Sequence, residues 1–327
     1  MKKVFSSFFA ALVAVVLLGC SAAEPMVAKK AEIPANKVQS VQIYFADNAD
    51  GKITPESISA AFDSVGLAVP GNNNMNGPFK LRFNNTYYNT YNLGMFINGD
   101  LSLKLIKKYP GFGVLAPLTM SIWSDDTKHT MNISTLTVDG MARAGNIPVT
   151  DPDLIAYAEL IKVALAKALP NGSFKALDFT LKSPAESFAI TFEAKLEDGA
   201  DATEYRENFE SQFEGELEPI GFLLPNYTNL KEELFDKAGF DEYDFYVTYS
   251  ICKFDVIYPV SRLHPEAGAY APCSFYAYKK KGENKAHMGF LGVDNWITTL
   301  DIEDEESIKP LREAQGMIEK VVNEMIE

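Results

Sequence analysis

The second half of this chain repeats the first half, and this repeat limits the folds that the chain can form. Pro70 and Pro225 lie in similar tripeptides, and Pro117 and Pro272 each close a Gly-x-x-Ala-Pro motif. Both pairs are 155 positions apart (225 − 70 and 272 − 117). Because two separate matches share one offset, we predict two domains of the same kind. A length of 327 residues and an apolar content of 47% suit two domains with cores of their own.

A third match lies between the two proline matches, and it has a different offset. The tetrapeptides 88–91 and 246–249 are similar, but they are 158 positions apart (249 − 91). This larger offset predicts an insertion of three residues in the second copy. We place the first copy at residues 38–170 and the second copy at residues 173–327.

Each copy has the pattern of a mixed α+β domain. Residues 41–45 and 189–193 alternate as half-buried strands do, and residues 177–181 predict an extra strand in the second copy. Asp151 and Asp304 mark the start of a longer helix at the end of each copy. We therefore predict two repeated α/β-sandwich domains, each a mainly antiparallel sheet with helices packed on one face. Two like domains in one chain also predict packing as a pseudo-dimer.

The N-terminus has the pattern of a bacterial lipoprotein. Residues 1–19 combine two early lysines with an apolar stretch that is short for a membrane span, and Cys20 follows directly. We predict a signal peptide over 1–19, lipidation of Cys20, and a flexible tether over 20–37. Ser21 favours the outer membrane over the inner one, with the folded part facing the periplasm. The alternative is an ordinary secretory signal with an accidental cysteine.

The charge of the chain argues against several classes of partner. The formal net charge is −14, and removal of the signal peptide would make the mature chain more acidic still. Such a charge disfavours nucleic acid and anionic lipid surfaces. The remaining partners are the membrane, reached through the lipidated N-terminus, and an unidentified periplasmic protein or small ligand.

The second copy resembles a known family. The segments 249–252, 265–268 and 271–274, followed by a hairpin that contains Lys-Gly, are similar to the bacterial family catalogued as domain of unknown function 302. The resemblance implies a small α+β domain that often dimerises, and it implies no defined reaction. The family pattern commonly has Asn-Pro after its first cysteine, whereas this chain has Lys253 and Phe254.

The first copy lacks the cysteines of the second. In our alignment Gly94 stands opposite Cys252, and Leu118 stands opposite Cys273. The first copy is therefore predicted to be a degenerate member of the tandem pair.

Cys252 and Cys273 are the candidate thiol pair of the mature chain. One interpretation is a structural disulfide, which an oxidising periplasm favours. A second is a redox or metal-binding pair with His287 as third ligand, a set that suits Cu(I) or Zn. A third is two separate buried cysteines that pack as small apolar residues.

Three tyrosines are candidates for contact with a ligand. Tyr87, Tyr88 and Tyr91 alternate with asparagines, and aromatic rings beside amide groups can bind sugars or flat organic ligands. The alternative is a tyrosine-rich strand that covers a helix.

No pattern of a catalytic triad, a phosphate-binding loop or an HExxH metal motif occurs in the sequence. We therefore predict a non-enzymatic envelope lipoprotein that acts as a binding or scaffolding module and needs no cofactor. The alternative is a periplasmic protein that handles thiol redox chemistry or soft metals through Cys252 and Cys273. An enzyme with a substrate between the copies is a weaker third hypothesis.

Overall fold

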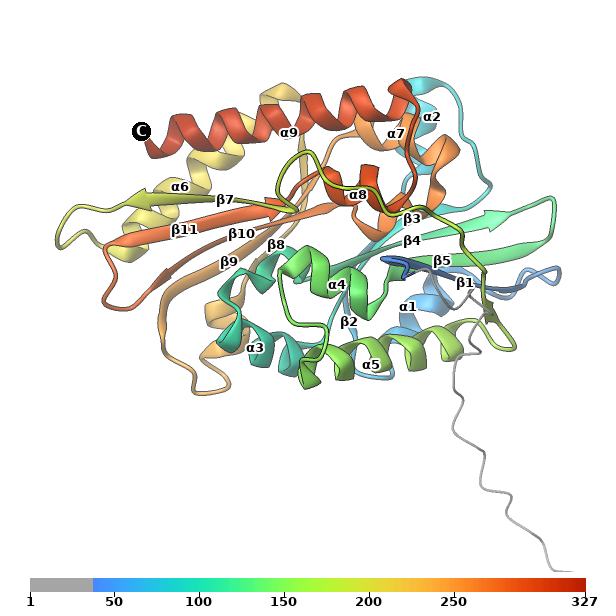
Figure 1. Ribbon diagram of the computed structural model, residues 1–327, viewed down its shortest axis with the longest axis horizontal. Coiled ribbons are helices and arrows are strands. Elements are labelled where there is room, and N and C mark those ends of the chain that lie inside the picture. Colours follow the sequence, from blue (N-terminus) through green and yellow to red (C-terminus); the bar gives the residue numbers. More distant parts are fainter. Residues whose placement is uncertain (1–37) are drawn as a thin grey trace, which may run out of the picture.

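Two antiparallel sheets form the framework of the computed structural model, which describes residues 38–327 (Figure 1). The predicted signal peptide, the predicted lipidation site Cys20 and the predicted tether lie outside the described residues. Helices α6 and α9 lie over the second sheet at the top of the view, and α1, α3 and α5 lie under the first sheet. The predicted α+β class is confirmed. In the described part of the chain, no helix is both long enough and apolar enough to cross a membrane.

The first half contains a sheet with the strand order β2-β3-β4-β5-β1-β6. Its strands are β1 (Val41–Asp47), β2 (Ala68–Asn74), β3 (Tyr91–Ile97), β4 (Leu118–Asp125), β5 (Thr130–Leu136) and β6 (Ser173–Phe174). Its helices are α1 (Pro55–Asp63), α2 (Asn76–Phe83), α3 (Gly99–Lys108), α4 (Val138–Gly145) and α5 (Pro152–Ala168), with a 3₁₀ turn η1 (Pro110–Leu115) before β4. Thr54 and Asp151 cap α1 and α5, each followed by a proline whose fixed backbone suits a first helical turn.

The second half contains a sheet with the strand order β7-β11-β10-β9-β8. Its strands are β7 (Ala189–Lys195), β8 (Leu223–Asn229), β9 (Tyr243–Cys252), β10 (Cys273–Lys280) and β11 (Lys285–Leu291). Its helices are α6 (Ala202–Leu217), α7 (Phe254–Leu263), α8 (Asp294–Thr299) and α9 (Glu305–Ile326), with short helical turns η2 (Glu218–Ile220), η3 (Lys231–Phe235) and η4 (Pro265–Ala269). Read from its other edge, this order repeats β2-β3-β4-β5-β1 of the first half.

The strand register corrects the predicted insertion. Ala68 pairs with Ile97 in the first sheet, and Leu223 pairs with Cys252 in the second, so both partners differ by the same 155 positions (223 − 68 and 252 − 97). Ile97 is therefore the counterpart of Cys252, and the alignment with Gly94 was wrong.

The next pair of strands agrees with this offset. Leu118 pairs with Phe96 and Cys273 pairs with Ile251, again 155 positions apart (273 − 118 and 251 − 96). The prolines that precede β4 and β10 both follow cis peptide bonds. The two sheets thus share strand order and register without an insertion between β2 and β5.

The sheet faces that no helix layer covers receive a turn from the other half. Turn η4 lies on the first sheet, where Ser121 Oγ donates a hydrogen bond to the Pro265 carbonyl (2.6 Å). Turn η1 lies on the second sheet, where the Tyr246 hydroxyl accepts from the Gly113 N–H (3.0 Å) and donates to the Pro110 carbonyl (2.6 Å). Each half therefore contacts the other in the same way: its turn, η1 or η4, lies on the sheet of the other half. The subunits of a twofold dimer contact each other in this reciprocal way.

Two glycines make this close approach possible. A Cβ atom at Gly268 would lie 2.8 Å from the Ser121 Cα on β4, and one at Gly113 would lie 2.6 Å from the Tyr276 Cβ on β10. No larger residue fits between either turn and the strand beneath it.

Two details of the linker between the halves differ from the prediction. Ser173 and Phe174, assigned to the second copy, form β6 and pair with β1 in the first sheet. The strand predicted over 177–181 is absent, because this segment runs between the sheets and has no strand beside it.

Candidate functional site

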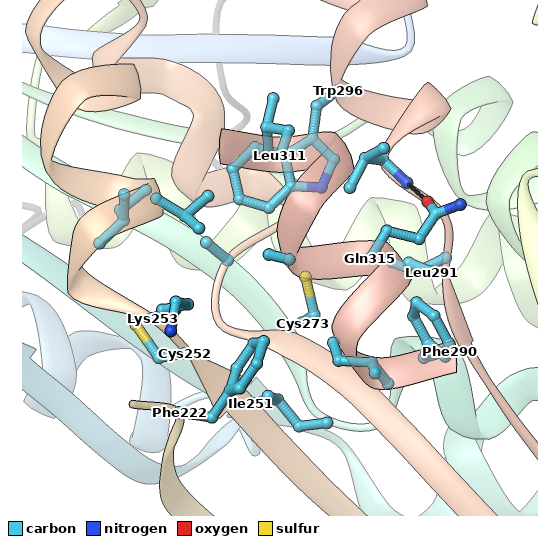
Figure 2. Close-up of a pocket in the computed structure, with 16 residues that line it drawn as sticks. Phe222, Ile251, Cys252, Lys253, Cys273, Phe290, Leu291, Trp296, Leu311 and Gln315 are labelled. Carbon is cyan, nitrogen blue, oxygen red and sulfur yellow. Dashed lines mark hydrogen bonds between the residues drawn. The ribbon is translucent and has the colours of Figure 1, made fainter. Parts of the chain in front are cut away.

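The register separates the two cysteines that the sequence singled out. Cys273 at the start of β10 pairs with Ile251, so Cys252 lies one residue further along β9. Successive side chains of a strand point to opposite faces, and Figure 2 shows that the two sulfur atoms do not face each other. Both thiols are free. The structure therefore places the two thiols on adjacent strands, at the edge of one small gap, without joining them in a disulfide.

His287 lies away from both cysteines. It sits on β11 opposite Tyr278, not beside Tyr276, and its ring stacks on Tyr278 with centroids 4.9 Å apart. Its ring nitrogens lie near carboxylates of Glu283 and Glu193. Tyr278 is five positions after Cys273 on β10 (278 − 273), which is roughly 16 Å along a strand.

The proposed three-ligand metal site is therefore absent from the structure. Within residues 38–327, no group of three or more His, Cys, Asp or Glu side chains is arranged to hold a metal ion. The strand register keeps His287 apart from Cys252 and Cys273, so these three side chains do not form one ligand set in the structure.

The gap beside Cys273 is small and apolar (Figure 2). It lies between the second sheet and α9 and has a volume of about 40 Å³, which is room for a few water molecules. Its walls include Phe222, Ile251, Phe290, Trp296, Leu311 and Ile318. This gap is part of the packed core and is too small for an organic ligand.

The three candidate tyrosines lie where the halves meet. Tyr91 is buried, and its hydroxyl donates to a main-chain carbonyl of η4 (3.4 Å). Tyr88 donates to the carbonyl of Ser261 on α7 (3.0 Å), and Tyr87 stacks on Tyr258 with centroids 4.8 Å apart. All three therefore contact the second half, and Tyr91 has no free ring face for a ligand.

Tyr87 and Tyr88 also line a cavity of about 440 Å³ between the halves. We call it the acidic cavity, because three carboxylates and one lysine line it. Its lining includes Tyr87, Tyr88, Trp123, Asp125, Asp126 and Glu266, with Lys175 as the lysine.

The carboxylates of the acidic cavity affect the pKa of Tyr88. Burial raises the pKa of Tyr88 to about 12, and the nearby carboxylates of Glu266 and Asp125 add to this effect. The Glu266 side chain is 8% exposed. Of the three carboxylates, Glu266 is therefore held in the buried part of the wall, whereas Asp125 and Asp126 lie at its solvent-exposed side.

A second cavity of about 600 Å³ lies at the corresponding place on the other side of the junction. We call it the basic cavity, because Lys108 and Arg143 line it and no carboxylate does. Pro110 of η1 lines the basic cavity, and its counterpart Pro265 of η4 lines the acidic cavity. The next residue is Gly111 in the basic cavity and Glu266 in the acidic cavity. The two cavities therefore differ in charge at equivalent positions.

Comparison with known proteins identifies the second half. Residues 201–325 match a family model described as "Domain of unknown function DUF302". We call the matched residues the DUF302 domain, after this similarity. A solved structure described as "Crystal structure of uncharacterized conserved protein DUF302 from Bacillus stearothermophilus" is 15% identical, with a TM-score of 0.34, and covers 42% of this chain and 96% of its own. A search of curated proteins finds no match.

The acidic cavity needs both the DUF302 domain and the first half. The DUF302 domain supplies Glu266 from η4, and the first half supplies the rings and the carboxylates Asp125 and Asp126. Sequence reasoning missed these three acids, because Glu266 is far from Asp125 and Asp126 in the chain. The one signal in the sequence was the repeat, because its alignment places Glu266 opposite Gly111 and so reveals a charge that only the second copy has.

Both thiols of the DUF302 domain are expected to react slowly. Burial raises the pKa of Cys252 and of Cys273 to about 12. Because the thiolate is the reactive form, its fraction near neutral pH falls by about a thousandfold. We expect iodoacetamide to modify both thiols at pH 7.5 only after urea unfolds the protein, as followed by mass spectrometry. Rapid labelling of the native protein would contradict this assignment.

His264 of the DUF302 domain should make stability depend on pH. Burial acts to lower the pKa of His264, but Glu266 (3.5 Å) and Asp304 (3.3 Å) outweigh it and raise the pKa. A raised pKa adds stability that is complete below the unfolded value of about 6.5 and is lost as the pH rises through the folded value.

We therefore expect His264→Gln to cost more stability at pH 5.5 than at pH 8.5. Urea unfolding of both proteins at each pH measures the difference. An equal cost at the two pH values would show that the imidazole gains no charge from its carboxylate neighbours.

Proposed function

We propose that this protein is a non-enzymatic binding module of the cell envelope, and that it holds a small molecule between its two halves. The observation that carries the proposal is the acidic cavity, which both halves build and which has a volume of about 440 Å³. Small-molecule sites usually have volumes of about 300–1,000 Å³ and lie at domain junctions.

The first half is proposed to be a diverged DUF302 copy that packs on the second as a pseudo-dimer. The shared strand order and the constant register offset from β2 to β5 support this. The reciprocal seating of η1 and η4 also supports it, because an isologous interface uses the same patch on both partners.

The N-terminal pattern supports an anchored location. We propose that residues 1–19 are a signal peptide, that Cys20 carries the lipid, and that residues 20–37 tether the fold to the outer membrane on its periplasmic side.

Binding is favoured over thiol chemistry. A redox or soft-metal protein needs accessible thiolates, and burial raises the pKa of Cys252 and Cys273 to about 12. The two sulfur atoms also point in different directions (Figure 2).

Native mass spectrometry of the full-length protein, purified from its own membranes without dialysis, tests the proposal. We expect a chain that begins at a lipidated Cys20 and carries a small molecule that denaturation releases. A chain that carries a stoichiometric metal ion, or a disulfide between Cys252 and Cys273, would support the thiol alternative. A chain with neither lipid nor a bound small molecule would contradict the proposal.

A further inference from the structure

The acidic cavity combines aromatic walls with an excess of negative charge. We infer that it binds an organic cation, namely an amine or quaternary ammonium group on a small molecule. This inference rests on the binding function proposed above and names the class of ligand.

The three carboxylates are only partly compensated. Glu266 has the His264 ring at 3.5 Å, and Asp126 accepts the Asn89 N–H (3.2 Å). Asp125 accepts the Thr127 hydroxyl (2.6 Å) and has the Lys128 amine at 3.6 Å, on a lysine side chain that is 71% exposed. Lys175 is the one basic side chain in the lining. The lining residues therefore carry a formal charge of −2 (three carboxylates and one lysine), which favours the entry of a cation.

The aromatic residues supply the second feature of a cation site. Tyr88 and Trp123 both line the cavity, where Tyr88 stacks on Tyr91 with one face and the Trp123 side chain is almost fully buried in the wall. The face of such a ring attracts a cation, most strongly where water is excluded. Quaternary ammonium groups are bound in this way, by several rings that surround the charge.

The basic cavity shows that the charge is specific to one side of the junction. Its lining has Lys108 and Arg143, and the Arg143 guanidinium already lies over the Phe188 ring at 4.2 Å. The two cavities occupy equivalent places in the repeated fold, yet only the acidic cavity is lined by carboxylates. The repeated fold alone therefore does not account for the negative charge. The acidic cavity alone is suited to a cation.

The two tryptophans allow a direct optical test. Trp123 lines the acidic cavity, and Trp296 lies in the core of the DUF302 domain, where its indole N–H has no partner. Trp296→Phe therefore sacrifices no hydrogen bond and leaves Trp123 as the single tryptophan. We would titrate this full-length variant with choline chloride, with sodium chloride at equal ionic strength, and with glucose.

We expect choline to change the Trp123 fluorescence with a saturable curve, and sodium chloride and glucose to cause no saturable change. Glu266→Gln should weaken choline binding by about fivefold or more. Glu159→Gln on the outer face of α5, where Glu159 is 59% exposed, is the matched control and should leave the curve unchanged. If Glu266→Gln does not fold, Asp125→Asn takes its place with the same expected loss.

Two results would overturn the inference. Equal responses to choline and sodium chloride would show that no cation site exists. Saturation by glucose, with no effect of either acid substitution, would show that the cavity binds a neutral ligand. That second result would leave the proposed binding function standing, whereas native mass spectrometry tests the function without assuming a cation.

Discussion

Gly268→Ala is expected to lower the free energy of unfolding by about 3 kcal/mol, in the upper range for overpacking. A Cβ atom at this position would lie 2.8 Å from the Cα of Ser121 on β4. Since that neighbour is backbone, no change of rotamer can relieve the clash. Turn η4 would have to move off the first sheet and lose the hydrogen bond between Ser121 and the Pro265 carbonyl. Urea unfolding measures the loss.

Gly316→Ala on α9 is the matched control for this substitution. A Cβ atom at Gly316 meets nothing within 4 Å, and alanine favours a helix over glycine by roughly 0.5–1 kcal/mol. The control should therefore be neutral or slightly stabilising. If Gly268→Ala behaves like Gly316→Ala, then η4 is not seated on β4 and the junction between the halves is wrong.

Asp294→Ala is expected to cost about 3 kcal/mol, because it removes a buried carboxylate that accepts from a main-chain N–H and from the partly exposed Arg312 guanidinium. Asp294 is fully buried, pairs with Arg312 of α9, and accepts the Glu186 N–H (2.6 Å). The carboxylate thus joins the linker between the halves to the last two helices. Urea unfolding measures the loss.

Asp255→Ala is the surface counterpart of Asp294→Ala. Its carboxylate pairs with Arg82, and both side chains are more than two-fifths exposed. Exposed pairs contribute about 0–1 kcal/mol, so this control should be nearly neutral. Equal costs for the two substitutions would contradict the burial of Asp294.

Local patterns were sufficient to predict the class of fold. Alternating apolar residues, capping acids and repeated prolines predicted strands, helices and turns that the structure contains. The constant offset of the prolines also held through β2 to β5. The similarity of residues 88–91 to 246–249 was misleading, because a tyrosine-rich strand can be aligned in several registers. A shift of three residues is an odd number, so it assigns side chains to the wrong face of the sheet.

The candidate site could not be predicted in the same way. Glu266 and Asp125 meet only because η4 of one half lies on the sheet of the other. No local pattern encodes that docking, which depends on close packing at Gly268. The cysteines attracted attention because their chemistry is distinctive, yet the register places their side chains on opposite faces of two adjacent strands.

The most direct test of the binding site is a crystal structure of the protein grown with choline. We expect the ammonium group to lie in the acidic cavity, against the rings of Tyr88 and Trp123 and beside the Glu266 carboxylate. An empty acidic cavity at a saturating choline concentration, or choline bound in the basic cavity beside Arg143, would contradict the site.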